Sequence, residues 1–123
     1  MLPNILLIAK QSLVDRSKIN DKRKDILLEI IKTWKKGDII YPNAIKSKLY
    51  ISFEEAYDLL DIFEEIGILE YVFQIYCHKC NKFQDRPILN SLNEFSDDIY
   101  CDEDHKLSPL EDTILLYRVK VDE

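Results

Sequence analysis

Apolar residues recur at helical spacing in several stretches of the first half of the chain. The segments 3–15, 21–36 and 53–66 follow an i, i+3, i+4 pattern, so each predicts an amphipathic helix with one buried face. A shorter helix is expected over residues 43–50, because Pro42 suits the first turn of a helix. The pattern therefore predicts a small helical domain, and Ile8 and Tyr50 are expected among its inward-facing residues.

Two of these helices carry recognisable start signals. Asn20 or Asp21 can cap the helix that begins near residue 21, because both side chains accept hydrogen bonds from free backbone N–H groups. Ser52 and Glu55 have the spacing of a capping box for the helix over 53–66, and a glycine follows that helix. The turn that joins the last two helices is therefore expected to be tight.

The remaining apolar segments are typical of strands. Residues 68–76 are rich in β-branched and aromatic side chains, and residues 113–121 alternate apolar with basic positions near their end. Residues 38–41 form a brief extended segment between two helices. Helices and strands together predict an α+β fold.

This order of elements resembles that of the winged helix-turn-helix family over residues 21–76. The stretch IIYPNAIKSKLYISFEEAYDLLDIFEEIGILEYVFQIYC carries the resemblance. The matching positions are Ile45, Leu49, Ile51, Ser52, Leu59, Leu60, Phe63, Gly67, Ile68 and Leu69. The resemblance implies a winged-helix domain whose third helix would be the recognition helix.

Length and composition favour one domain with a small appendage. The chain has 123 residues, of which 46% are hydrophobic and 33% are charged, as in ordinary globular proteins. We expect an N-terminal docking helix or arm at 1–20, the winged helix at 21–76, and a further module at 77–123. The N-terminal helix could pack on the core or form a homodimer contact. The longest apolar run is too short for a membrane span, so a cytoplasmic protein is expected.

Charge is distributed unevenly along the chain. The net charge is -6, yet residues 1–48 carry a balance of +6. The helix over 53–66 is acidic on its exposed side, and no Lys or Arg occurs between residues 49 and 78. Because DNA repels such a helix, we expect it to contact protein. The candidate protein-binding residues are Glu54, Glu55, Asp58, Asp61 and Glu65.

The basic first half offers an alternative function. Lys and Arg side chains on the helices near residues 21–36 and 43–50 could form a face that attracts nucleic acid without strong sequence preference. The candidate nucleic-acid-binding residues are Lys22, Arg23, Lys32, Lys35, Lys36, Lys46 and Lys48. A transcriptional regulator would use this basic face in place of the acidic helix.

The three cysteines and two histidines of the chain all lie in two short stretches, each containing Ile-Tyr-Cys. Cys77 and Cys80 have a Cys-x2-Cys spacing, and Cys101 and His105 have a Cys-x3-His spacing. Together they supply a Cys3His set, which is common in closed tetrahedral zinc sites. A structural zinc ion is therefore expected, with Asp104 or His78 as alternatives to His105.

Two extended approaches to one metal ion resemble the paired knuckles of a zinc ribbon. A winged helix followed by a zinc ribbon is similar in element order to the alpha subunit of archaeal transcription factor E. The sequence lacks a glycine-rich phosphate loop and a Ser-His-Asp set, so an enzyme is not expected. The resulting hypothesis is a zinc-binding adaptor, a small subunit that contacts a larger protein.

Overall fold

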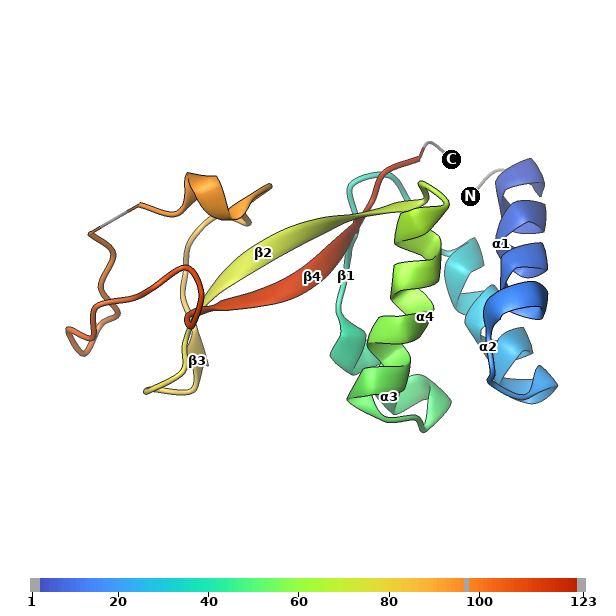
Figure 1. Ribbon diagram of the computed structural model, residues 1–123, viewed down its shortest axis with the longest axis horizontal. Helices are drawn as coiled ribbons and strands as arrows, with labels where there is room; N and C mark the ends of the chain where they lie inside the picture. The colour runs from blue at the N-terminus through green and yellow to red at the C-terminus, as the bar shows by residue number, and fades with distance from the viewer. Residues whose placement is uncertain (1–2, 97, 122–123) are drawn as a thin grey trace. The chain divides into compact units, whose positions relative to one another are not determined.

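A computed structural model of the protein describes residues 3–96 and 98–121 (Figure 1). These residues contain four α-helices, one 3-10 helix and four strands, which form an antiparallel sheet of order β1-β4-β2-β3. The predicted α+β class is confirmed. The elements are α1 (Pro3–Arg16), α2 (Asp21–Lys32), β1 (Ile39–Ile40), α3 (Pro42–Leu49), α4 (Phe53–Glu65), β2 (Leu69–Cys77), β3 (Lys82–Phe83), η1 (Leu92–Glu94) and β4 (Thr113–Val119).

The described chain divides into two compact units. The first contains the residues up to Glu70 together with those from Tyr117 onward, and the second contains Tyr71–Leu116. Strands β2 and β4 therefore each contribute residues to both units. The backbone N–H of Lys120 donates to the carbonyl of Ile68 just beyond one end of this strand pair. The backbone N–H of Tyr76 donates to the carbonyl of Asp112 near the other end.

The first unit is a helical layer packed around one apolar core. The helices contribute Leu13, Leu27 and Ile31, which are completely buried, and Trp34 meets Phe63 edge to face with 6.0 Å between ring centroids. Aromatic pairs of this geometry add to the stability gained from burial. None of the helices in the described ranges has the length and apolar character needed to cross a membrane.

The predicted helix starts are confirmed. The Asn20 side chain accepts a hydrogen bond from the backbone N–H of Arg23 at the start of α2. Ser52 and Glu55 form both bonds of the capping box at the start of α4. Gly67 follows α4 with a φ of 86°, a left-handed conformation that glycine adopts without steric cost.

Two predicted core residues lie instead at the surface. Ile8 on α1 is 53% exposed, because Ala9 and Leu13 mark the buried side of that helix. Tyr50 is 86% exposed, because the chain turns into the left-handed conformation there and ends α3. Helical spacing identified both helices, but it did not identify the edge of the buried face on each helix.

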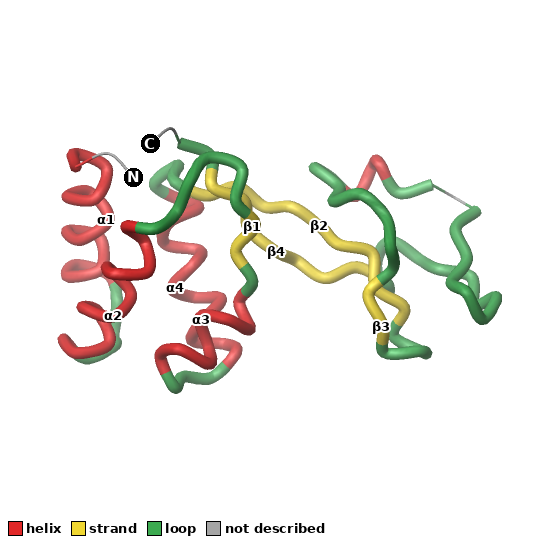
Figure 2. Tube along the Cα trace, turned by 180° about the vertical axis from the view of Figure 1, so that it is seen from behind, coloured by secondary structure: helices red, strands yellow, loops and turns green. Residues whose placement is uncertain are grey.

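The second unit consists mostly of loops (Figure 2). Its two-residue strand β3 pairs with the end of β2, and Phe73 pairs with Leu89 in an isolated bridge. The buried cluster of this unit is small and includes two of the cysteines; it comprises Ile75, Cys77, Leu89, Phe95, Ile99, Cys101 and Leu107. So few apolar side chains are a weak basis for folding, and small units of this kind commonly need a metal or disulfides.

Candidate metal centre

The four predicted metal ligands lie together in the second unit. Cys77, Cys80, Cys101 and His105 each offer one ligand atom, and these atoms all lie within 4.8 Å of one another. Cys77 and Cys101 are buried, whereas Cys80 and His105 are partly exposed. The cluster could therefore hold a metal ion, as the spacing of the cysteines and the histidine predicts.

Two tight turns bring these side chains together. Cys77 ends β2, and the chain reverses through Asn81, whose φ is 57°. The second turn contains Asp104, whose φ is 62°. Asn and Asp are the non-glycine residues that best tolerate this left-handed conformation, so the local sequence suits both turns. The second turn is closed by a bond of 3.0 Å from the Cys101 backbone N–H to the His105 carbonyl.

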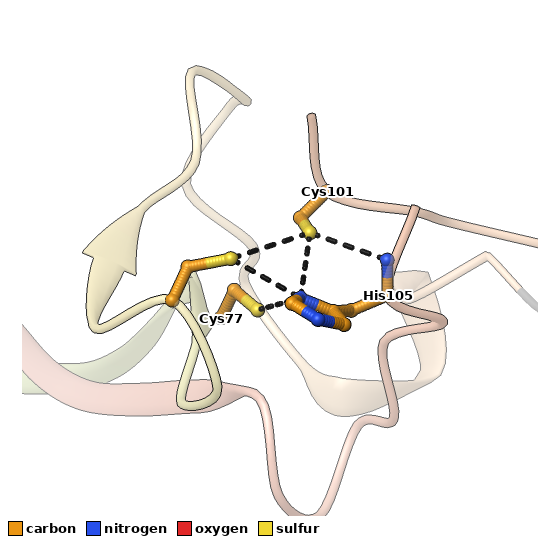
Figure 3. Close-up of side chains that lie close together, drawn as sticks. Cys77, Cys101 and His105 are labelled. Carbon is orange, nitrogen blue, oxygen red and sulfur yellow. Dashed lines mark hydrogen bonds between the residues drawn. The ribbon is translucent and has the colours of Figure 1, made fainter. Parts of the chain in front are cut away.

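The sulfur atoms surround one nitrogen of the His105 ring. His105 Nδ1 lies 3.6 Å from the Sγ of Cys77, 3.1 Å from that of Cys80 and 3.3 Å from that of Cys101. The Sγ atoms of Cys80 and Cys101 are 3.6 Å apart. Figure 3 shows the Cys77 and Cys101 side chains pointing toward the His105 ring. Four donor atoms at these separations can share one ion.

The environment separates the acidities of two of the thiols. A hydrogen bond to Glu103 raises the pKa of Cys80, and burial and the neighbouring thiols raise it further. Burial also acts to raise the pKa of Cys101, but hydrogen bonds from the His105 and Glu103 backbone and from the other two thiols lower it to about 7. The thiolate is the form that binds metal, so the Cys101 thiol is more readily available as a ligand than the Cys80 thiol.

The two alternative fourth ligands lie outside this cluster. Asp104 is exposed, and it does not belong to either group of clustered donor atoms found in the described ranges. His78 belongs to a second group with Glu111 and Asp112. Glu103 is the contact that sequence reasoning missed, with its Oε2 atom 3.0 Å from Cys80 Sγ. The acidic run after Cys101 was its only signal.

The five acidic candidates on α4 differ in their surroundings. Glu54 and Asp58 are exposed, while Glu55 is held in the capping box with Ser52. Asp61 accepts a hydrogen bond of 2.5 Å from the buried Tyr117 hydroxyl, and Glu65 forms an ion pair with Arg16. Three of the five carboxylates therefore have contacts within the first unit.

The basic candidates also divide into two groups. Lys22, Lys35 and Lys48 are exposed, as are Lys32 and Lys36. Arg23 instead donates to the carbonyl oxygens of Leu49 and Tyr50 at the end of α3. Lys46 lies over the Phe53 ring, with its Nζ atom 5.1 Å from the ring centroid.

We compared the chain with protein-family models, with characterised proteins and with solved structures, and none of the three comparisons gave a match.

Proposed function

We propose that this chain is a non-enzymatic zinc-binding adaptor of winged-helix type, a small subunit that contacts a larger protein through α4. The observation that carries the proposal is the acidic exposed side of α4, where Glu54 and Asp58 face solvent and no basic residue lies between positions 49 and 78. A helix in this position would be repelled by the phosphates of DNA. A basic protein surface would attract it.

Zinc is the metal that best suits the Cys3His set. Tetrahedral zinc with Zn–S bonds of about 2.3 Å and a Zn–N bond of about 2.0 Å requires donor atoms roughly 3.5 to 3.8 Å apart. Four of the six separations in the cluster lie between 3.1 and 3.6 Å, close to these values, and all six are within 4.8 Å. With four protein ligands the site would be closed, which favours a structural role over catalysis.

The order of elements supports the winged-helix assignment. In the first unit α2, β1, α3 and α4 follow one another, and β2 leaves directly after α4 to pair with β4. The second unit, with one ligand pair at the end of β2 and in the turn that follows, and the other between η1 and β4, would correspond to the zinc-ribbon-like module.

A hollow beside Asp58 supports a protein contact at α4. It has a volume of about 320 Å³ and is lined by the buried residues Ile19, Leu59 and Ile62 and by the acidic residues Glu55 and Asp58. Its lining is completed by Arg16, Ser17 and Lys18, and Arg16 is paired with Glu65. An apolar side chain of the partner could enter this hollow while a neighbouring Lys or Arg pairs with the carboxylates. Interfaces are commonly anchored in this way, by a buried side chain with polar contacts around it.

The decisive experiment reverses one charge on α4. Asp58→Lys should abolish co-purification with the partner complex from native cells. The new lysine would face the basic surface of the partner, and the two positive charges would repel each other. Asp25→Lys is the matched control, since Asp25 is an exposed carboxylate in the middle of α2. Glu55 is unsuitable for this test because its substitution would also remove the capping box. Equal retention of the partner by both variants would overturn the acidic contact.

The second candidate function is nucleic-acid binding by the basic residues of the first half. It is favoured by the exposure of Lys32, Lys35 and Lys36 at and after the end of α2. Replacing Lys35 and Lys36 with Gln should weaken duplex binding and reduce its dependence on salt. With fewer phosphate contacts, binding releases fewer counterions. Fluorescence anisotropy with a labelled duplex measures both effects, and an unchanged salt slope would exclude this face.

A further inference from the structure

A second group of metal-type side chains lies beside the Cys3His cluster. His78, Glu111 and Asp112 offer donor atoms within 4.8 Å of one another. Proximity alone would allow a second ion. The surroundings of Asp112 argue for a different role, because its carboxylate is already surrounded by hydrogen-bond donors.

Both oxygen atoms of the Asp112 carboxylate accept hydrogen bonds. Oδ1 lies 3.2 Å from the backbone nitrogen of His78 and 2.5 Å from its ring Nδ1. Oδ2 lies 2.8 Å from the backbone nitrogen of Ser108. Asp112 is only 2% exposed, whereas Glu111 is exposed. Three hydrogen bonds therefore already occupy this carboxylate, in a place that water scarcely reaches, which favours a structural role over metal binding.

The donors come from the two segments that carry the metal ligands. His78 directly follows Cys77, and Ser108 lies three residues after His105. The backbone of Asp112 adds two hydrogen bonds of 2.8 Å. Its N–H donates to the carbonyl of Ser108, and its carbonyl accepts from the N–H of Tyr76. Asp112 is therefore bonded to the residues on both sides of Cys77 and to the segment that follows His105.

We propose that Asp112 is the positioning residue of the metal centre. With His78 and Ser108 it forms a hydrogen-bonded clamp, and the group of His78, Glu111 and Asp112 is not a second metal site. The clamp holds the Cys77 turn at a fixed distance from the segment that carries Cys101 and His105. This inference rests on the proposed zinc site and explains how the ligands of that site are held in position.

Asp112 can hold the two segments together because a buried polar group is destabilised when it loses its hydrogen-bond partners. Burial acts to raise the pKa of Asp112, but hydrogen bonds from Ser108 and His78 outweigh it and hold the pKa below its ordinary value. The carboxylate is therefore ionised at neutral pH, and hydrogen bonds to a charged acceptor are stronger than bonds between neutral groups. Partners beyond the ligands themselves commonly change metal affinity by about 10- to 100-fold.

The test measures how fast zinc leaves the full chain. Asp112→Asn preserves the shape of the side chain but places an NH2 group against one set of N–H donors. In the zinc-loaded protein, transfer of zinc to a chromogenic chelator should be at least about tenfold faster for Asp112→Asn than for the natural sequence. His78→Ala, which removes only the ring contact, should give a smaller increase.

Two controls separate positioning from general destabilisation. Glu111→Gln removes the neighbouring exposed carboxylate and should leave the rate of zinc release unchanged. Ser52→Ala weakens α4 in the first unit and should also leave it unchanged. In Co²⁺-substituted protein, the ligand-field absorption bands should shift for Asp112→Asn and stay constant for both controls.

Each outcome decides the inference. Zinc release from Asp112→Asn at the rate of the controls would overturn it. If Asp112→Asn does not fold, His78→Ala decides, and an unchanged release rate there would overturn it equally. Two zinc equivalents per natural chain, with one lost in His78→Ala, would show a second metal site instead. Absence of zinc binding by the natural chain would overturn the proposed zinc site itself, which is a separate result.

Discussion

Tyr50 adopts an unusual conformation for its residue type. Its φ and ψ are 55° and 50°, and it ends α3 in the left-handed region that most side chains avoid at a cost of roughly 1 kcal/mol. Its side chain is 86% exposed, so burial does not offset that cost. Phe53, three residues later, is 50% exposed. Strained positions of this kind cluster at functional sites.

Replacing Tyr50 should therefore stabilise the protein and weaken partner binding. Tyr50→Asn keeps the left-handed conformation at lower cost, and Tyr50→Gly removes the cost, so the free energy of unfolding should rise by up to about 1 kcal/mol. Urea denaturation measures this change, and co-purification measures the partner. Lower stability of both variants would contradict the strain argument. Full retention of the partner would remove Tyr50 from the contact surface.

The ligands of the candidate metal centre were predictable, but the residue that positions them was not. Cys77 and Cys80, like Cys101 and His105, are paired by short spacing, and such spacing is visible in a sequence. Asp112 reaches His78 across 34 positions. Nothing in its own neighbourhood distinguishes it from an exposed carboxylate, because the contact arises only when β2 and β4 pair.

At the scale of elements, local signals identified the helices and the longer strands. The capping box at Ser52 and the apolar stripe of α4 are both confirmed, because each depends on residues within one or two turns. The errors at Ile8 and Tyr50 have a different origin. Both lie at the margin of an apolar stripe, where burial depends on what the neighbouring elements cover, and that is a tertiary property.

The capping box gives a prediction at this scale. Ser52→Ala removes the acceptor of the Glu55 backbone N–H and should lower the free energy of unfolding by about 1 kcal/mol. Chemical denaturation followed by Trp34 fluorescence measures the loss, since Trp34 is the only tryptophan and packs against Phe63 of α4. Ser52→Asp, which retains a capping acceptor, should recover most of the stability. Equal losses for both variants would contradict a capping role.

At the scale of the whole molecule, the two units differ in what stabilises them. The first unit has a continuous apolar core that includes Trp34, Phe63 and Tyr117. The second has seven buried residues in its cluster, two of which are candidate metal ligands. When the ligands are assembled only on folding, the free energy of metal binding becomes part of the free energy of folding. The second unit should therefore depend on zinc far more than the first.

Removing the metal should unfold one unit and leave the other folded. A strong chelator should allow trypsin to cleave after Lys79, Lys82 and Arg86. These residues lie at the surface, in the loops and short strand next to the candidate ligands, and the backbone around them would unfold without the metal. Trp34 is 4% exposed and belongs to the first unit, so its emission maximum should stay constant during chelation. Cys77→Ser should reproduce the cleavage without chelator, and added zinc should protect only the natural chain. A red shift of the Trp34 emission at the same chelator concentration would show that zinc stabilises the whole chain as one unit.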